Sequence, residues 1–341
     1  MRLKAILKPM KSLTVYFTMP PYNIQWLRSF DFAKEFLLLN PITVIDIGSR
    51  DGSCDELAGI KKFSNYIGFD ADAESVEKDT LSGNSNWRSF QIISKYIGPE
   101  KGTTSFNLYV RKSESSALKP SPTYQANFSR RLRVESQVRV ESDTLSNVLT
   151  ENNLLPDLIK IDTQGTEYEI IESSRTIFSN SLMVEVEAEF LEMYDSQKLF
   201  PDVCKLMYQL GYQLLYVNRV FGNMNTKIVV TRGQLVFGDF LFGLNFERAI
   251  SLTIERKMKY CLLLINYGHI DFAFQLYDSD KSFRSLHPEL DNVFRSHFKR
   301  PIRSKIVKAF ISQFDKIAFV YLSIRKTNGL HFDSDRSWPI R

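Results

Sequence analysis

The sequence predicts an α/β fold built around a doubly wound, mostly parallel sheet. Two observations lead to this prediction. Short and almost continuous apolar runs alternate with segments of helical periodicity, and the first run, Ile42–Ile47, leads directly into a glycine-rich turn at residues 48–52. Strands that are apolar on both faces are typical of parallel sheets covered by helices on both sides.

The 341 residues suit one large domain or two modest ones, and 43% hydrophobic content is ordinary for a globular chain. We expect a helical lead-in over residues 1–40, because apolar residues recur with helical spacing from Trp26 and stop before Pro41. The main domain is expected over residues 41–245. Beyond it, residues 246–341 indicate a basic helical appendage whose apolar stripe should pack on the core.

The elements of the main domain follow from the periodicity of each segment in turn. Apolar or alternating runs predict strands at residues 42–47, 66–69, 88–93, 158–162, 182–186, 212–217 and 234–243. Helical patterns occupy residues 53–62, 73–81, 143–149, 165–174 and 200–210, and beyond the main domain residues 248–266 and 269–277.

Two segments lie between the third strand and residue 143. The alternating run at residues 98–110 suits a strand or hairpin. Residues 123–136 show no clear period and contain Arg130, Arg131 and Arg133. We expect this segment to be a loop that faces the substrate, and an insertion without a role is an equally good interpretation.

The formal net charge of +5 is too small to indicate a nucleic-acid binder. The positive excess lies at the ends of the chain: from Arg284 onward there are 12 lysines and arginines and five acids. These ends could contact anionic lipid or an acidic partner, although a solvated surface is the simpler interpretation. We expect no transmembrane segment, because no apolar run reaches the length needed to span a bilayer.

Cysteine and histidine usage bounds the compartment and the chemistry. Cys54, Cys204 and Cys261 are scattered and odd in number, so they favour neither a disulfide framework nor a metal site, and we expect a reducing compartment, the cytoplasm. The four histidines all follow residue 268 and form no paired metal-binding motif. Zinc chemistry and a Ser-His-Asp triad are therefore disfavoured, and no residue is assigned to a metal.

The glycine turn is the first candidate site. Asp46, Gly48, Ser49, Asp51 and Gly52 lie where a strand ends and a helix begins, and backbone N–H groups there can approach a ligand closely. The two acids would repel the pyrophosphate of a dinucleotide and favour a ligand with an amino group and a sulfonium, such as S-adenosylmethionine. An ordinary βα turn without a ligand is the alternative interpretation.

Two further positions extend this site along the sheet. Asp70 ends the second strand 18 residues after Gly52, where an acid can bind both hydroxyls of a ribose. Ser94 follows the third strand. Ligands of open α/β sheets bind at the carboxyl ends of the strands, which is where both residues fall.

A second group of polar residues surrounds the end of the fourth strand. Asp162 follows the run at residues 158–161, and Glu167 shares the apolar face of the next helix. A carboxyl group on an apolar face needs a partner or a ligand, so it is a site candidate. The alternatives are an acid stabilised by the helix dipole for Glu167 and a strand lysine paired with a nearby acid for Lys160.

Six motifs of the chain resemble, in order, those of the FkbM family of S-adenosylmethionine-dependent methyltransferases. They are VIDIGSRDG, YIGFDAD, SSALKP, PDLIKIDTQGTEYEII, MVEVEAEFLEMY and FGDFLF. The resemblance covers about residues 42–245, and its most specific part is the D-x-x-K-I-D-x-x-G-x-E spacing at residues 157–167. It implies a Rossmann-like, seven-stranded methyltransferase sheet and O-methylation of a sugar, glycan or other small hydroxylated metabolite by in-line displacement.

The resemblance also implies roles for single residues. Around the cofactor, Asp46, Gly48, Ser49 and Gly52 would line the methionine part, Asp70 would hold the ribose, and residues near Ser94 would flank the adenine. The residues near the transfer site would be Lys160, Asp162 and Glu167.

The chain departs from the family pattern at Ser49, Arg50 and Asp51, where we expect Arg50 to pair with Asp51 or to meet the substrate, and at Asp143, an acid displaced from the usual T-L-D element. Two other classes of function remain open. The domain could have lost catalysis and serve as a binding module, or the sheet could belong to an NAD(P)-dependent oxidoreductase.

Overall fold

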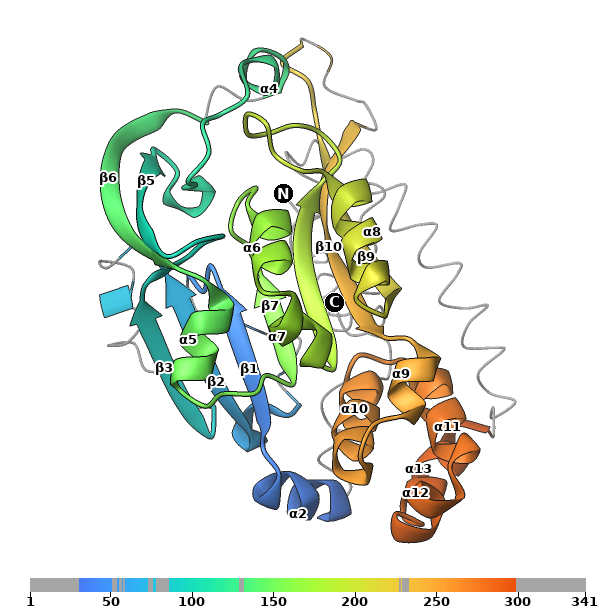
Figure 1. Cartoon of the computed structure of the whole chain (residues 1–341). Helices are drawn as coiled ribbons and strands as arrows, with labels where there is room; N and C mark the ends of the chain where they lie inside the picture. The colour runs from blue at the N-terminus through green and yellow to red at the C-terminus, as the bar shows by residue number, and fades with distance from the viewer. Residues whose placement is uncertain are drawn as a thin grey trace, which may run out of the picture.

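The computed structural model describes residues 31–298 except for 51–53, 55–56, 58, 73–75, 78–85, 129–131, 227 and 229–232. Within these residues, seven strands form one sheet in the order β3-β2-β1-β7-β8-β10-β9 (Figure 1). The strands are Ile42–Ile47 (β1), Ser64–Asp70 (β2), Ser89–Ser94 (β3), Leu158–Ile161 (β7), Met183–Glu189 (β8), Tyr212–Gly222 (β9) and Gln234–Leu244 (β10). The doubly wound α/β fold expected from the sequence is therefore confirmed.

The topology of this sheet determines where a ligand can bind. Parallel pairing joins β3, β2, β1, β7 and β8, and β10 runs antiparallel to both of its neighbours. The chain passes outward from β1 to β3 and then returns to place β7 on the other side of β1. The strand order thus reverses between β1 and β7, and open α/β sheets bind ligands outside the carboxyl ends of the strands at such a point.

Burial on both faces explains the apolar runs of the central strands. Every residue of β1 except Thr43 is buried, and in β7 only Lys160 is partly exposed. Helices α5 (Leu145–Glu151), α6 (Glu167–Ser173) and α7 (Arg175–Asn180) cover the near face in Figure 1, and α8 (Phe200–Gln209) packs against α6 and β9. Each fully buried aliphatic side chain of this core contributes about 1.5–3 kcal/mol.

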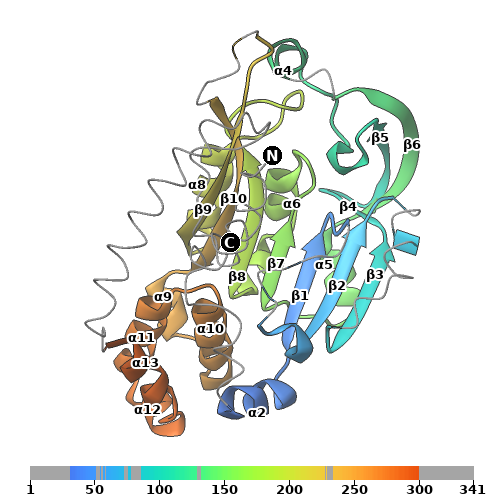
Figure 2. The ribbon, with the colours of Figure 1, turned by 180° about the vertical axis from the view of Figure 1, so that it is seen from behind.

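A smaller sheet of three strands lies beyond the carboxyl ends of β1, β2 and β3, as Figure 2 shows. Among the described residues its strands are Tyr96–Ile97 (β4), Gly102–Tyr109 (β5) and Val134–Asp143 (β6), in the order β4-β6-β5. The strand or hairpin expected at residues 98–110 is therefore confirmed. Because this sheet stands over the strand ends, it can enclose a ligand bound there.

Part of residues 123–136, expected to form a loop, belongs to regular structure. Helix α4 (Pro122–Asn127) begins after Ser121, whose hydroxyl accepts the N–H of Tyr124, and β6 begins at Val134. The expectation is wrong for these parts because β6 is exposed along most of its length and pairs through backbone hydrogen bonds, so its sequence carries no apolar period. Arg130 and Arg131 lie outside the described residues.

Five helices follow the large sheet in the described part of the chain. They are Phe246–Ile250 (α9), Ile254–Asn266 (α10), Ile270–Ser279 (α11), Lys281–Leu286 (α12) and Leu290–Phe298 (α13). The helix expected over residues 248–266 is divided, because the Thr253 side chain caps a new start at α10. Lys259 Nζ lies 2.9 Å from Asp157 Oδ2, and the Tyr260 hydroxyl donates to the Leu244 carbonyl at 2.8 Å. These helices share a core with the sheet, so the division into domain and appendage stays a proposal.

Several expected elements fall largely or wholly outside the described residues. They are the start of the lead-in at residues 1–30, the helix at residues 73–81, and the apolar stripe at residues 306–321. The helix expected at residues 53–62 is described only in part, and its end belongs to a short 3-10 helix, Lys61–Phe63 (η3). The end of the lead-in forms α2 (Asp31–Leu39), which buries Ala33 and Leu37. None of the helices described here has the length and apolar character needed to cross a membrane.

Candidate active site

Two cavities lined by described residues meet at the carboxyl ends of the central strands. The smaller, of about 150 Å³, lies over the ends of β1 and β2 beside β4. The larger, of about 1170 Å³, lies between the turn Lys112–Glu114 (η4), α4 and the ends of β9 and β10. Ser113, Asp162 and Gln164 line both cavities. The structure therefore holds two compartments that share one wall.

Gly48 follows β1 and packs against the backbone that follows β7, at the edge of the smaller cavity. Its φ is +85°, and a β-carbon at this position would stand 1.9 Å from the carbonyl oxygen of Asp162. Only glycine fits such a contact. The N–H groups of Gly48 and Ser49 donate to the carbonyl oxygen of Phe69 at 2.8 and 3.1 Å. The turn is thus held by β2 on one side and by β7 on the other, with backbone exposed to the cavity.

Asp70 and Arg50 lie next to each other in the lining of the smaller cavity. Asp70 Oδ1 accepts the N–H of Asp72 at 2.7 Å, and its Oδ2 lies 3.8 Å from Arg50 Nε. The Arg50 guanidinium also donates to Asp72 Oδ2 at 2.9 Å. Arg50 therefore pairs with Asp70, the last residue of β2, and with Asp72, whereas the sequence suggested Asp51 or the substrate as its partner. Asp51 and Gly52 lie outside the described residues.

Asp46 and Ser49 lie behind the glycine turn and are not among the described residues that line the smaller cavity. Asp46 is 3% exposed, and its Oδ2 accepts the hydroxyl of Tyr66 at 2.7 Å and the thiol of Cys54 at 3.6 Å. Burial and the Asp46 charge raise the pKa of Tyr66, so this hydroxyl stays a donor. Ser49 packs under Gly68, where a β-carbon would meet its Oγ at 2.5 Å. Both polar residues brace the turn from below.

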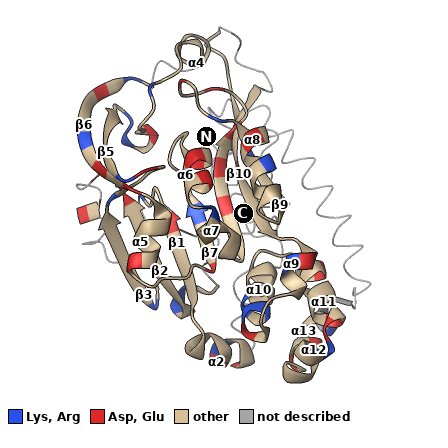
Figure 3. Cartoon of the chain, viewed as in Figure 1, with Lys and Arg blue, Asp and Glu red and all other residues tan. Residues whose placement is uncertain are grey.

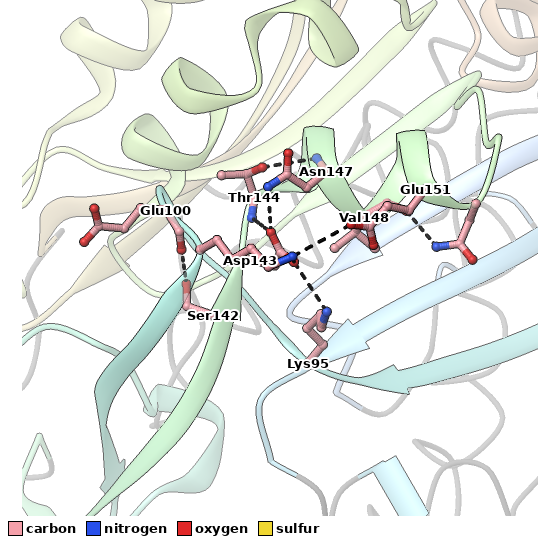
Figure 4. Close-up of polar contacts among 10 residues, drawn as sticks. Lys95, Glu100, Ser142, Asp143, Thr144, Asn147, Val148 and Glu151 are labelled. Atoms are coloured by element: carbon pink, nitrogen blue, oxygen red, sulfur yellow. Dashed lines mark hydrogen bonds and ion pairs between the residues drawn. The ribbon is translucent and has the colours of Figure 1, made fainter.

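The wall beyond β3 is formed by residues that follow Ser94. Ser94 itself is exposed, and Lys95, Tyr96 and Ile97 line the smaller cavity. Figure 4 shows how Asp143 holds Lys95: Asp143 Oδ2 lies 3.6 Å from Lys95 Nζ, and its Oδ1 accepts the side-chain amide of Asn147 at 2.9 Å. Burial alone would raise the pKa of Asp143, but these hydrogen bonds and nearby lysines lower it below its usual value.

Asp143 also explains a shift in one predicted helix. The helix expected at residues 143–149 begins at Leu145, because Thr144 is its N-cap and accepts the N–H of Asn147 at 3.1 Å. Asp143 is still the last residue of β6.

Asp162 occupies the wall between the two cavities. Its Oδ1 accepts the side-chain amide of Gln164 at 2.7 Å, and the same amide nitrogen lies 2.9 Å from Glu187 Oε1. Burial raises the pKa of Asp162 to about 6, although the Gln164 hydrogen bond and the charge of Lys160 act in the opposite direction. Among the predicted residues, Gly48, Asp70 and Asp162 are thus brought together around the smaller cavity.

Glu167 is not among the described residues that line either cavity, and its carboxylate closes the turn that precedes its own helix. Its carboxylate accepts the N–H groups of Thr163 and Gly165 at 2.7 and 3.0 Å and the Thr163 hydroxyl at 2.9 Å. The residue is 3% exposed, and burial raises its pKa to about 7, with the Asp162 charge adding to the effect. This geometry favours a structural role, in which Glu167 shapes the backbone at residues 163–165.

Lys160 is likewise outside the described lining of both cavities. Its Nζ lies 3.7 Å from Glu185 Oε1, and in the sheet it stands beside Asp46 of β1. The arrangement matches the interpretation of a strand lysine paired with a nearby acid. Its charge still acts on Asp162, two residues further along the chain.

Gln164 and Glu187 are site residues that the sequence did not indicate. Figure 3 shows the acidic positions of β8 and α6 as red segments of the ribbon, in the middle of the molecule. Glu185, Glu187 and Glu189 alternate along β8, a pattern that could have identified an acidic face of the strand. In the described part of the chain, no group of three or more His, Cys, Asp and Glu side chains is arranged to hold a metal ion.

Comparisons with known proteins place this geometry in a family. Residues 46–214 match the methyltransferase FkbM domain. Among solved structures, magnesium protoporphyrin IX methyltransferase from Synechocystis PCC 6803 with bound S-adenosylmethionine is similar, at 8% identity, 64% coverage of this chain, 79% coverage of that chain and a TM-score of 0.33. A putative RNA methyltransferase from Pyrococcus horikoshii is similar at 11% identity, with 69% and 97% coverage and a TM-score of 0.32. No curated protein matches the sequence.

The smaller cavity suits S-adenosylmethionine, the cofactor of this family. Position 48 admits no side chain, and Asp70 stands at the carboxyl end of β2, where ribose hydroxyls are bound in open α/β sheets. The FkbM match and the sheet lead to the same conclusion. Through residues 46–214, the chain belongs to the FkbM family of S-adenosylmethionine-dependent methyltransferases.

Proposed function

We propose that the protein methylates a hydroxyl group of a sugar, a glycan or another small hydroxylated metabolite. The observation that carries this proposal is the position of Asp162, which lines both cavities at once. A carboxylate between a donor site and an acceptor site can hold the acceptor and receive its proton.

The donor would lie in the smaller cavity. Gly48 would admit it close to the backbone, Asp70 would hold the ribose, and Lys95, Tyr96 and Ile97 would enclose the adenine. The cofactor supplies an electrophilic methyl group when bound. The carboxylates of Asp70 and Asp162 favour a cationic ligand in this cavity over a neutral one.

The acceptor would lie in the larger cavity. Its lining contains Tyr124 and Phe128, whose rings stack with centroids 5.2 Å apart, and Phe237. It also contains Asp162 and Glu187. A sugar has apolar C–H faces and hydroxyl edges, so a cavity lined by both aromatic rings and carboxylates supports a sugar-like acceptor.

Asp162 carries the main chemical task in this proposal. With a pKa of about 6, its carboxyl group is mostly ionised at neutral pH and can accept the proton of the attacking hydroxyl. Two compartments on either side of this residue favour in-line displacement. Orienting the hydroxyl toward the donor site can itself contribute several kcal/mol to the rate.

The test is a methyl-transfer screen with radiolabelled S-adenosylmethionine against sugars, lipids and polyketide-like compounds. We expect the wild type to label a hydroxylated acceptor and Asp162→Asn to lower turnover about 100-fold, in the range of general-base catalysis. By calorimetry, Asp162→Asn should bind S-adenosylhomocysteine within a few-fold of the wild type.

Two results would contradict the proposal. Wild-type protein that binds S-adenosylhomocysteine but labels none of these acceptors would point to a binding module. Calorimetric binding of NAD(P) in place of S-adenosylhomocysteine would point to an oxidoreductase.

A further inference from the structure

The side chain of Gln164 stands on the shared wall and contacts two carboxylates, that of Asp162 on the same wall and that of Glu187 in the larger cavity. Its Nε2 lies 2.7 Å from Asp162 Oδ1 and 2.9 Å from Glu187 Oε1. We propose that Gln164 is a positioning residue for methyl transfer, whose amide group holds the Asp162 and Glu187 carboxylates at the boundary between the two cavities. This inference rests on the function proposed above, because it assigns Asp162 to the acceptor.

The orientation of the Gln164 amide follows from its partners. An amide NH₂ group has two hydrogens to donate, and here each has a carboxylate oxygen to accept it. The amide oxygen, Oε1, lies 2.9 Å from the hydroxyl of Tyr194. Burial raises the pKa of Tyr194 well above its usual value, so this hydroxyl remains a donor, which it shares with the Glu114 carbonyl oxygen at 3.0 Å. The opposite orientation of the amide would set its oxygen against two carboxylates.

The backbone of Gln164 is held as firmly as its side chain. Its φ is +59°, in the left-handed region that non-glycine residues occupy only when their surroundings require it. The hydroxyl of Ser116 donates to the Gln164 carbonyl oxygen at 2.7 Å. Glu167 accepts the N–H groups of Thr163 and Gly165, the residues on either side of Gln164. The loop at Ser116 and helix α6 therefore hold the backbone of Gln164 in place.

The Asp162 and Glu187 carboxylates stay ionised more readily when the Gln164 amide donates hydrogen bonds to them. Like charges at short distance and burial both favour protonation, and hydrogen bonds to the charged form oppose it. The charged groups around this wall, among the described residues, are Lys160 and Asp162 on β7 and its end, Asp46 on β1, Glu187 and Glu189 on β8, Asp239 on β10, Glu167 on α6, and Arg50, Asp70, Lys95, Arg111, Lys112 and Glu114 on the cavity walls. Most of them are acids, so loss of the Gln164 donors leaves Asp162 more readily protonated.

The first measurement needs no acceptor. Protein labelled with ¹³C at aspartate carboxyl groups is titrated by NMR, and the Asp162 signal is identified by its loss in Asp162→Asn. We expect a midpoint near the pKa of about 6 in the wild type and a midpoint about one pH unit higher in Gln164→Met, which keeps the side-chain length without donors. Gln164→Glu, which keeps the shape of the side chain, should raise the midpoint as well and serves if the methionine variant does not fold.

The second measurement uses methyl transfer at saturating acceptor. The acid limb of the pH profile for kcat should move upward by the same one unit in Gln164→Met, while the KM for S-adenosylmethionine stays within about threefold. The control is Gln209→Met, the same substitution at the exposed end of α8, where the side chain contacts Arg175 at 3.5 Å. This variant should leave both the midpoint and the profile unchanged.

The outcomes separate this inference from the proposed function. An unchanged Asp162 midpoint in both Gln164 variants, with only a lower Tm, would reduce Gln164 to a structural brace and overturn the inference. A shifted midpoint in a protein that transfers no methyl group would support the contact and overturn the proposed function. A shifted midpoint together with a shifted kcat profile supports both.

Discussion

Gly48 packs so closely on the carbonyl group of Asp162 that no other residue type fits at position 48. A β-carbon there would stand 1.9 Å from the Asp162 oxygen, well inside any allowed contact. The end of β1 and the end of β7 are far apart in the sequence, yet this contact makes them one wall. The cofactor cavity therefore depends on a glycine for its shape and on an aspartate for its charge.

Gly48→Ala should remove cofactor binding as well as stability, because the turn must move away from Asp162. We expect S-adenosylhomocysteine affinity to fall more than tenfold by calorimetry. Gly268→Ala is the matched control: Gly268 also has a φ of +85°, but among the described residues nothing lies within 4 Å of its absent β-carbon. It should lower the free energy of unfolding by about 1–2 kcal/mol from backbone strain alone and leave binding unchanged. Equal effects of the two variants on binding would contradict the account.

The pH dependence of turnover should report Asp162. A general base acts only when ionised, so kcat/KM should fall as the pH decreases through about 6, the pKa to which burial raises this group. Asp162→Asn should retain low activity without this limb. A wild-type limb near pH 4, the range of an unperturbed aspartate, would show that Asp162 is not the group that controls the reaction.

Glu167 should affect stability in a pH-dependent way. Its pKa in the folded protein is about 7, against an ordinary value of 4.5, so the folded state keeps a proton that the unfolded state releases. The resulting stabilisation is full below pH 4.5 and is lost as the pH rises through 7. Glu167→Gln, which cannot ionise, lacks this term, so the wild type should lose up to about 3 kcal/mol relative to the variant over that range. Urea unfolding at pH 4.5 and 7.5 measures it, and a constant difference would refute the prediction.

Arg50 should tune the preference for a charged cofactor. Its guanidinium lines the smaller cavity, paired with Asp72, and repels a sulfonium more than a neutral thioether. Arg50→Met should raise the affinity for S-adenosylmethionine relative to S-adenosylhomocysteine about two- to fourfold, as expected for one screened charge at roughly 10 Å. The control is Arg88→Met. The Arg88 guanidinium donates to the Leu38 carbonyl oxygen, so this variant should leave the affinity ratio unchanged. A ratio that stays the same or falls in Arg50→Met would contradict this role, and an equal loss of affinity for both ligands would mean that Arg50 contacts the carboxylate that they share.

Much of the fold could be predicted from the sequence, because its central strands are buried on both faces and therefore appear as apolar runs. β1, β7 and β8 are of this kind. β6 is not: it is stabilised by backbone pairing with β5 and exposes most of its side chains, so no period marks it. Short, exposed or edge elements bury few side chains, so they produce no apolar period in the sequence.

Site residues could be predicted from the sequence where their place at the end of a strand determines their role. They could not be predicted where contacts between distant segments determine it. Gly48 and Asp162 directly follow β1 and β7, the strands at the switch point, Asp70 ends β2, and all three residues line the smaller cavity. Asp46 and Lys160 lie two residues before Gly48 and Asp162 and are neighbours in the sheet. Their side chains contact other partners, Tyr66 and Glu185. The role of Gln164 depends on residues from β8 and from two distant loops, which no local pattern brings together.

A crystal structure with S-adenosylhomocysteine bound tests the central claim most directly. We expect the ribose hydroxyls within hydrogen-bond distance of Asp70 and the sulfur in the smaller cavity, facing the wall formed by Asp162. A ligand bound elsewhere, or one whose sulfur is separated from Asp162 and from the larger cavity, would contradict the assignment of Asp162 to methyl transfer.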